Sequence, residues 1–339
     1  MEPLIEGVQG ILDDLRFLEE KNERHEFKAS FWQQNSDFNL GRDVLIAAAG
    51  SISNQVTKFS LVMGKHDVPK EALSVCHALY EPCQQLLAAL KVAIFAGAGY
   101  ALTKELSQGA HRILANILEL STRLQQKDLA RIPEFTGRIW DACTLLESVS
   151  KSNLIATKRI MLQTVSVLND TVQELDTALM DARAGAADNG GDDSIERNVE
   201  DEDDLDFDMD ASLSVVEINQ LALSVDVLKM AQAISKKGVL ALNGSDGDDG
   251  FVAWGDAFPA IYARIQTAVV DMGADLCPPF EADVVADHVG VLQTVGAACL
   301  RHLQCQPGVT TPAIDLEKGS AAFAAKVAAT LAALHEDTD

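Results

Sequence analysis

The spacing of apolar residues constrains this chain more than any other feature of its sequence. Across most of the 339 residues they recur at alternating steps of three and four, which places them on one side of an α-helix. No stretch alternates apolar and polar residues for long enough to indicate a strand. The chain is therefore predicted to be all-α. The most regular series, between residues 153 and 184, is Leu154, Met161, Val165, Leu168, Val172, Leu175 and Leu179.

The same spacing predicts helices in both halves of the chain. Gly64, Pro69, Pro278 and Pro279 fall between the apolar series, where glycine and proline favour helix ends. Pro82 lies inside a predicted helix and is expected to kink or split it, because proline removes a backbone hydrogen bond. The expected helices cover residues 3–24, 27–63, 70–97, 102–126, 133–149, 153–184, 213–242, 250–276, 281–304 and 315–335.

An acidic segment interrupts the helical pattern after residue 184. Residues 188–210 contain twelve Asp or Glu and a single Arg, almost half of the chain's net charge of −24. Like-charge repulsion and few apolar groups leave little to offset the entropy of ordering such a segment. We therefore expect two antiparallel helical bundles, residues 1–184 and 213–339, joined by an acidic disordered linker at 185–212. We also expect this linker to be dispensable for folding but to tune partner binding.

The overall charge limits the classes of partner. A net charge of −24 and a pI near 4.5 repel phosphate backbones and anionic lipids, so direct nucleic-acid binding is not expected. The most apolar stretch, residues 86–102, falls short of the roughly 20 residues that span a bilayer and is expected to be a buried helix. The sequence opens without a secretory signal, and none of its six cysteines forms a CxxC pair. We expect reduced thiols and a cytoplasmic and nuclear location.

The sequence contains no catalytic motif that we recognise. Gly97 and Gly99 imitate the turn that binds a dinucleotide, but Leu102 stands where the third glycine is required. A helix end is the better interpretation of this pair. There is no Gly-x-Ser-x-Gly, P-loop or His-Glu-x-x-His segment. We therefore expect no enzymatic activity and no cofactor.

Two groups of residues have the spacing of metal ligands. Cys299, His302 and Cys305 lie three residues apart, but structural zinc usually takes four ligands, and cysteines on an apolar face are usually core residues. The alternating Asp residues at 204–210 begin like a calcium loop, yet Met209 occupies the position that requires glycine. We expect no dedicated metal site at either place.

Three leucines are the candidate partner-binding residues. Leu221, Leu228 and Leu242 fall in heptad register, with Ser235 breaking the series, and this pattern is typical of a dimerising zipper. The alternative is a core stripe of the second bundle. No basic segment precedes the leucines, which excludes a DNA-binding zipper.

Several short segments occur in a distinctive order along the chain. They are Glu26-Phe27 with Phe31-Trp32, Leu102-Thr-Lys-Glu-Leu106 with Gly109-Ala110, Trp140-Asp-Ala-Cys143, and Leu276-Cys-Pro278-Pro279 beyond the acidic segment. Together they resemble the Grap- and cyclin-D-interacting protein family, the cyclin-D-binding proteins. The similarity covers most of the chain and is weakest over residues 305–339.

This resemblance implies an all-helical protein without catalytic residues. It also implies binding to D-type cyclins or helix-loop-helix factors, with restraint of cell-cycle progression or transcription. Family members have been described as helix-loop-helix regulators without a basic region, and this chain also lacks one. The alternative function is a cytoskeletal adaptor of the vinculin or talin kind, because such adaptors also stack long amphipathic helices.

Overall fold

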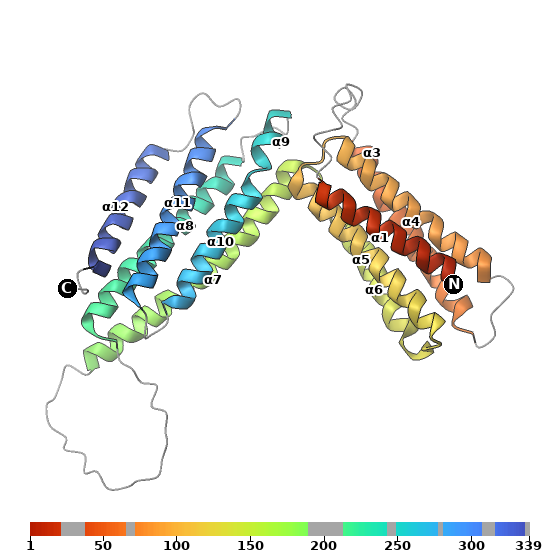
Figure 1. Ribbon diagram of the computed structural model, residues 1–339, viewed down its shortest axis with the longest axis horizontal. Helices are drawn as coiled ribbons and strands as arrows, with labels where there is room; N and C mark the ends of the chain where they lie inside the picture. The colour runs from red at the N-terminus through yellow and green to blue at the C-terminus, as the bar shows by residue number, and fades with distance from the viewer. Residues whose placement is uncertain are drawn as a thin grey trace, which may run out of the picture. The chain divides into compact units, whose positions relative to one another are not determined.

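The computed structural model describes residues 1–21, 38–65, 72–188, 213–242, 249–276, 281–306 and 316–335. Within these ranges every regular element is a helix and no residue belongs to a strand (Figure 1). The all-α prediction is therefore confirmed. The chain divides into two compact units, Met1–Thr157 (unit 1) and Lys158–Asp339 (unit 2). No helix in the described part of the chain combines the length and apolar character needed to cross a membrane.

Unit 1 is a ring of five helices around an aliphatic core. Helix α3 packs on α4 and α6, α5 packs on α6 and α1, and α1 packs on α4. Gly41 brings α3 against α4, since a Cβ there would lie 2.9 Å from the backbone nitrogen of Ala93. The helices of unit 1 are α1 (Glu2–Lys21), α3 (Phe38–Met63), α4 (Ala72–Phe95), α5 (Tyr100–Gln125) and α6 (Ile132–Glu147), with a 3-10 turn η2 (Leu129–Arg131) before α6.

Two details of unit 1 follow from Pro and Gly positions. Helix α4 continues through the buried Pro82 and packs against α1 and α3 on its way, so the proline does not split the helix. After α4, Gly97 adopts a φ of +106°, a conformation that favours glycine. The Asn153 side chain joins this turn: its Nδ2 donates to the Gly97 carbonyl at 2.9 Å and its Oδ1 accepts from the Gly99 N–H at 2.6 Å. Gly97 and Gly99 therefore lie in the turn that follows the end of α4.

The long helix α7 (Asn153–Asp188) lies mostly in unit 2. Three side-chain pairs connect it to other helices of that unit: Thr164 with Gln266 at 3.1 Å, Asn169 with Gln232 at 2.8 Å, and Asp176 with Lys229 at 2.6 Å. From the sequence, this helix was predicted to belong to the first domain, and the linker was predicted to begin at residue 185. In the structure the division falls after Thr157 and α7 continues to residue 188. Residues 189–212 lie outside the described part of the chain.

The other helices of unit 2 pack around α8 and α11. Helix α8 packs on α10, α11 and α12, while α11 also packs on α10 and α12. Gly238 on α8 admits the ring of Tyr262, whose hydroxyl donates a 2.6 Å hydrogen bond to the Ser235 carbonyl. These helices are α8 (Val215–Ala241), α9 (Asp249–Gly255), α10 (Phe258–Asp275), α11 (Ala282–Gln304) and α12 (Leu316–His335).

Candidate protein-interaction surfaces

The three leucines of the zipper hypothesis lie inside unit 2. Leu221 is 1% exposed, and Leu228 and Leu242 are fully buried. Their side chains therefore form a core stripe within this fold, which was the alternative interpretation of the heptad register. In this arrangement they offer almost no surface to a partner.

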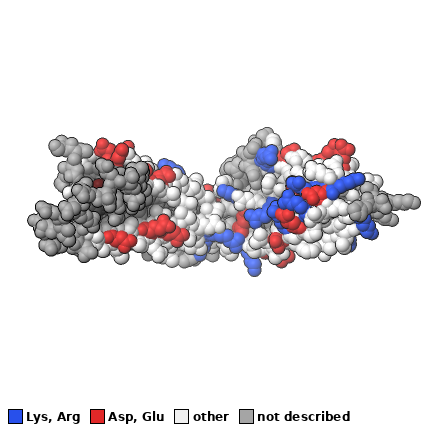
Figure 2. Space-filling model, turned by 90° about the horizontal axis from the view of Figure 1, so that it is seen from below, with Lys and Arg blue, Asp and Glu red and all other residues white. Residues whose placement is uncertain are grey.

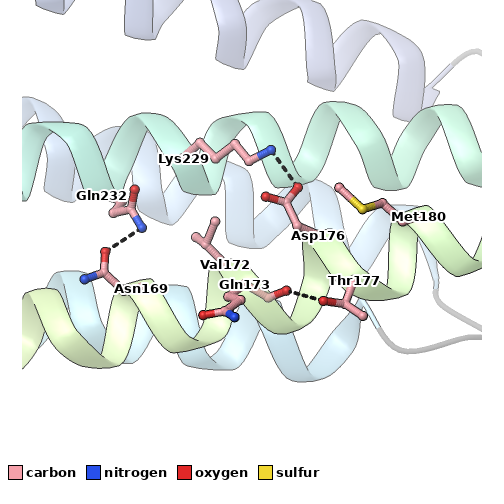
Figure 3. A pocket seen from close by; sticks show the side chains of 8 residues that line it. All are labelled: Asn169, Val172, Gln173, Asp176, Thr177, Met180, Lys229 and Gln232. Carbon is pink, nitrogen blue, oxygen red and sulfur yellow. Dashed lines mark hydrogen bonds and ion pairs between the residues drawn. The ribbon is translucent and has the colours of Figure 1, made fainter.

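An open groove lies between α7 and α8 on unit 2. It has a volume of about 600 Å³ and is open to solvent; Figure 3 shows the side chains that line it. Val172 is a buried apolar residue of the groove, and Met180 is 68% exposed. The lining residues are Asn169, Val172, Gln173, Asp176, Thr177 and Met180 from α7 and Lys229 and Gln232 from α8.

Polar contacts across the groove fix its two walls. The Lys229 ammonium lies 2.6 Å from Asp176, and the Gln232 amide donates to the Asn169 side chain at 2.8 Å (Figure 3). Both members of the ion pair are partly exposed, so this pair contributes at most about 1 kcal/mol. Because the hollow is open, it does not enclose a small molecule, and it is better suited to side chains of another protein.

The Cys299 triad is not assembled as a metal site. Burial raises the pKa of the Cys299 thiol to about 12, whereas Cys305 is exposed. His302 Nε2 lies 2.8 Å from the Trp254 carbonyl; since a carbonyl only accepts, this nitrogen carries a proton. Within the described residues no group of three or more His, Cys, Asp or Glu side chains is arranged to hold a metal ion. The alternating Asp residues at 204–210 lie outside the described residues.

The five described cysteines are all free thiols. Cys83 and Cys143 in unit 1 are buried, and burial raises the pKa of each thiol to about 12. A thiol with so high a pKa carries almost no thiolate near neutral pH and is a poor nucleophile. These cysteines are therefore core residues.

The two units differ sharply in charge. Unit 1 contains sixteen Lys or Arg and nineteen Asp or Glu, whereas unit 2 contains eleven and thirty-two. On the face drawn in Figure 2, Lys and Arg gather over unit 1. The net charges are thus −3 and −21, so the acidic character of the chain belongs almost entirely to unit 2.

Unit 1 also carries an exposed tryptophan that the sequence analysis treated only as a family feature. Trp140 on α6 is 44% exposed. Its indole Nε1 donates toward the Ser53 carbonyl at 3.3 Å and the Thr57 hydroxyl at 3.2 Å, both on α3. Tryptophan is usually mostly buried, so its position on the surface could not be derived from its apolar character. The indole is instead fixed by residues more than eighty positions earlier in the chain.

Comparison with known proteins gives matches in agreement with this fold. The sequence profile of the N-terminal region of the Grap2 and cyclin-D-interacting family matches residues 44–181. The cyclin-D1-binding protein 1 homologue of Xenopus laevis is 25% identical over 315 residues, which is 87% of each chain. The chain therefore resembles the Grap2 and cyclin-D-interacting family over most of its length. The matched profile covers nearly all of α3, the whole of α4, α5 and α6, and most of α7. It therefore includes Trp140 and the α7 wall of the groove.

Proposed function

We propose that this chain is a non-enzymatic regulator that acts by binding other proteins, with D-type cyclins or helix-loop-helix factors as partners. The observation that carries the proposal is the relative named as a cyclin-D1-binding protein homologue, which aligns along 87% of both chains. Because the alignment is nearly full-length, both units have counterparts in the relative.

The surfaces of the molecule support a binding role. An open groove on unit 2 and a half-exposed indole on unit 1 both offer apolar atoms beside fixed polar groups. Aromatic residues and methionine are enriched at protein interfaces. By binding its partner the protein would restrain cell-cycle progression or transcription in the cytoplasm and nucleus.

Direct binding tests this proposal. Purified full-length chain is titrated with a purified D-type cyclin and, separately, with a helix-loop-helix domain, by calorimetry at physiological salt. We expect one of them to bind with a Kd in the micromolar range or tighter. Absence of heat with both at concentrations of about 100 μM would remove the proposed partners. Co-sedimentation with actin filaments in the same preparation would point to an adaptor instead.

A further inference from the structure

The seam between α3 and α6 on unit 1 forms an exposed surface, the Trp140 face, made of Ser53, Thr57, Leu61, Gly137 and Trp140. The two helices run antiparallel here. On α6, Ile132 lies near Gly64 and Thr136 contacts Ser60 at 2.7 Å. Trp140, later on α6, contacts Thr57 and Ser53, which come earlier on α3. This register places Leu61, one turn after Thr57, on the same side of Trp140 as Gly137.

The Trp140 face combines exposed apolar side chains with a glycine. Leu61 is 70% exposed and Trp140 is 44% exposed. Gly137, three residues before Trp140 on α6, has no heavy atom within 4 Å of the position that a Cβ would occupy. Small residues at a helix seam let another helix come close, and large side chains on both sides supply ridges that fit its grooves. The shape therefore suits a third helix lying along α3 and α6.

The indole is held in place before any partner arrives. The bonds from Nε1 to Ser53 and Thr57 turn the N–H edge toward α3 and fix the ring orientation. An aromatic side chain that is already ordered loses little conformational entropy on binding. Tryptophans of this kind are the most frequent binding hot spots.

The charges around the face specify the partner. Lys58 and Lys65 lie three residues before and four residues after Leu61 on α3, and both are exposed. Arg131 and Arg138 instead lie over the Phe135 ring of α6, 5.1 and 5.0 Å from its centroid, and both pair with Glu134, at 3.1 and 2.6 Å. The α3 side of the face is therefore basic, on a chain whose net charge is −24. A helix with acidic flanks is thus complementary to this face, and a basic one is complementary to unit 2.

We infer that the Trp140 face docks an amphipathic helix of a partner protein, with apolar anchors along one stripe and acidic residues on its flanks. This inference rests on the proposed protein-binding function and assigns it a site. Helix-in-groove recognition of this type uses anchors spaced at i, i+3 or i+4 and i+7. One anchor would lie over Gly137, beside the Trp140 indole.

The test uses the full-length chain and two synthetic helical peptides that share one leucine stripe but carry Glu or Lys on their flanks. The variants are Leu61→Glu and Trp140→Ala. The control variant is Leu73→Glu on α4, because Leu73 is 73% exposed and α4 is not one of the two helices that form this face. Calorimetry is done at physiological salt, where charges beyond about 8 Å are screened, and circular dichroism checks that each variant is folded.

We expect the acidic peptide to bind the parent and Leu73→Glu alike, and to lose at least about tenfold in affinity with Leu61→Glu and Trp140→Ala. If Trp140→Ala fails to fold, the affinity of the acidic peptide for Leu61→Glu alone tests the inference. Equal affinity for the parent and Leu61→Glu overturns the inference. A preference of the face for the basic peptide overturns its charge assignment. Self-association of the parent that Leu61→Glu abolishes would identify a second copy as the occupant.

A D-type cyclin provides a separate measurement on the same variants. We expect Leu61→Glu to weaken its binding while Leu73→Glu does not. If the cyclin binds the parent and Leu61→Glu equally, the proposed function stands and the docking site is wrong. If the cyclin does not bind the parent at all, the proposed cyclin partner fails, and the peptide result alone decides whether the face is a docking site.

Discussion

Units 1 and 2 use tryptophan in opposite ways. In unit 2, Trp254 is 6% exposed and joins α9 to α11: its Nε1 donates to the His302 carbonyl at 2.9 Å, and His302 Nε2 donates back to the Trp254 carbonyl at 2.8 Å. In unit 1, Trp140 is 44% exposed, and its Nε1 donates to Ser53 and Thr57 of α3. One indole therefore stabilises its unit, whereas the other remains available to a partner.

The charges reinforce this contrast. Unit 1 is close to neutral at −3, and unit 2 carries −21. A strongly acidic surface attracts basic groups at long range but also repels itself. We infer that unit 1 supplies a short-range apolar contact and unit 2 a long-range electrostatic one. Variants in each unit test this division of roles.

The largest expected effect comes from removing the buried indole. Trp254 stacks on His302 at 5.6 Å between ring centroids and meets Phe258 edge-on at 4.7 Å. Trp254→Ala should cost about 3–5 kcal/mol of the stability of unit 2, because it leaves a cavity and removes the indole N–H that donates to the His302 carbonyl. Peptide-resolved hydrogen exchange of the full chain should show faster exchange in α9, α10 and α11, with α3 to α6 unchanged. Equal acceleration in both units would mean that they unfold together.

A smaller loss of stability is expected from Gly238→Ala on α8, where the Tyr262 ring packs against the glycine. A Cβ at Gly238 would overlap the Tyr262 hydroxyl, so Gly238→Ala must displace a buried ring that is hydrogen-bonded to Ser235. Overpacking of this kind costs about 1–3 kcal/mol. The matched control is Gly290→Ala on α11, which has open space around the new methyl group and should stabilise by up to about 1 kcal/mol through helix propensity. Chemical denaturation of both variants measures the difference, and a stable Gly238→Ala variant would contradict the packing assigned to Tyr262.

Contacts between distant residues are the part of this structure that the sequence pattern could not predict. The three-and-four spacing predicted helix positions well, because it reports which face of each helix is apolar. It does not report which neighbour that face meets, so it could not indicate that the two compact units divide after Thr157, near the start of α7. For the same reason the register of Leu221, Leu228 and Leu242 could not by itself separate a zipper from a core stripe. The orientation of Trp140 depends on Ser53 and Thr57, and no local pattern encodes a contact at that separation.

The N-terminus of α8 should contribute a moderate, pH-dependent amount to stability. Ser214 and Glu217 form a capping box: the Ser214 hydroxyl accepts from the Glu217 N–H at 3.2 Å, and the Ser214 N–H donates to the Glu217 carboxylate at 2.7 Å. The bond from the Ser214 backbone lowers the pKa of Glu217 below its ordinary 4.5. A lowered pKa means that this contribution is present above pH 4.5 and is lost as the pH falls through the folded value.

Two variants at this helix start test that sign. Ser214→Ala should lower stability by about 1 kcal/mol at neutral pH. The stability advantage of the parent over Glu217→Gln should shrink as the pH falls from 7 to 3. Glu281→Gln at the N-cap of α11 is the control, because Glu281 makes no side-chain capping bond, and its difference from the parent should show no such trend. Thermal melts across this pH range give the measurement.

The smallest effect on stability is expected from the acidic segment, although its effect on binding rates should be clear. Since α7 ends at Asp188, a Gly-Ser replacement of residues 189–210 leaves the described helices intact. It removes eleven acids and one Arg and changes the net charge from −24 to −14. We predict a melting temperature within a few degrees of the parent, because so polar a segment buries little, and a Gly-Ser chain keeps the helices connected.

The rate of association separates a steering role from a tether. Charges act over a Debye length of about 8 Å at physiological salt and about 30 Å at 0.01 M, so the segment should matter most at low salt. Stopped-flow binding of the Lys-flanked peptide to unit 2 should slow on replacement at 0.01 M salt and converge with the parent near 0.5 M. The Glu-flanked peptide should instead bind faster after replacement at low salt, because a repulsive charge has been removed. Identical rates at every salt concentration would mean that the segment only connects the helices. Unfolding of unit 2 on replacement would show that the segment is part of the core. Opposite changes for the two peptides would establish that the charge of the segment selects which partner reaches the chain first.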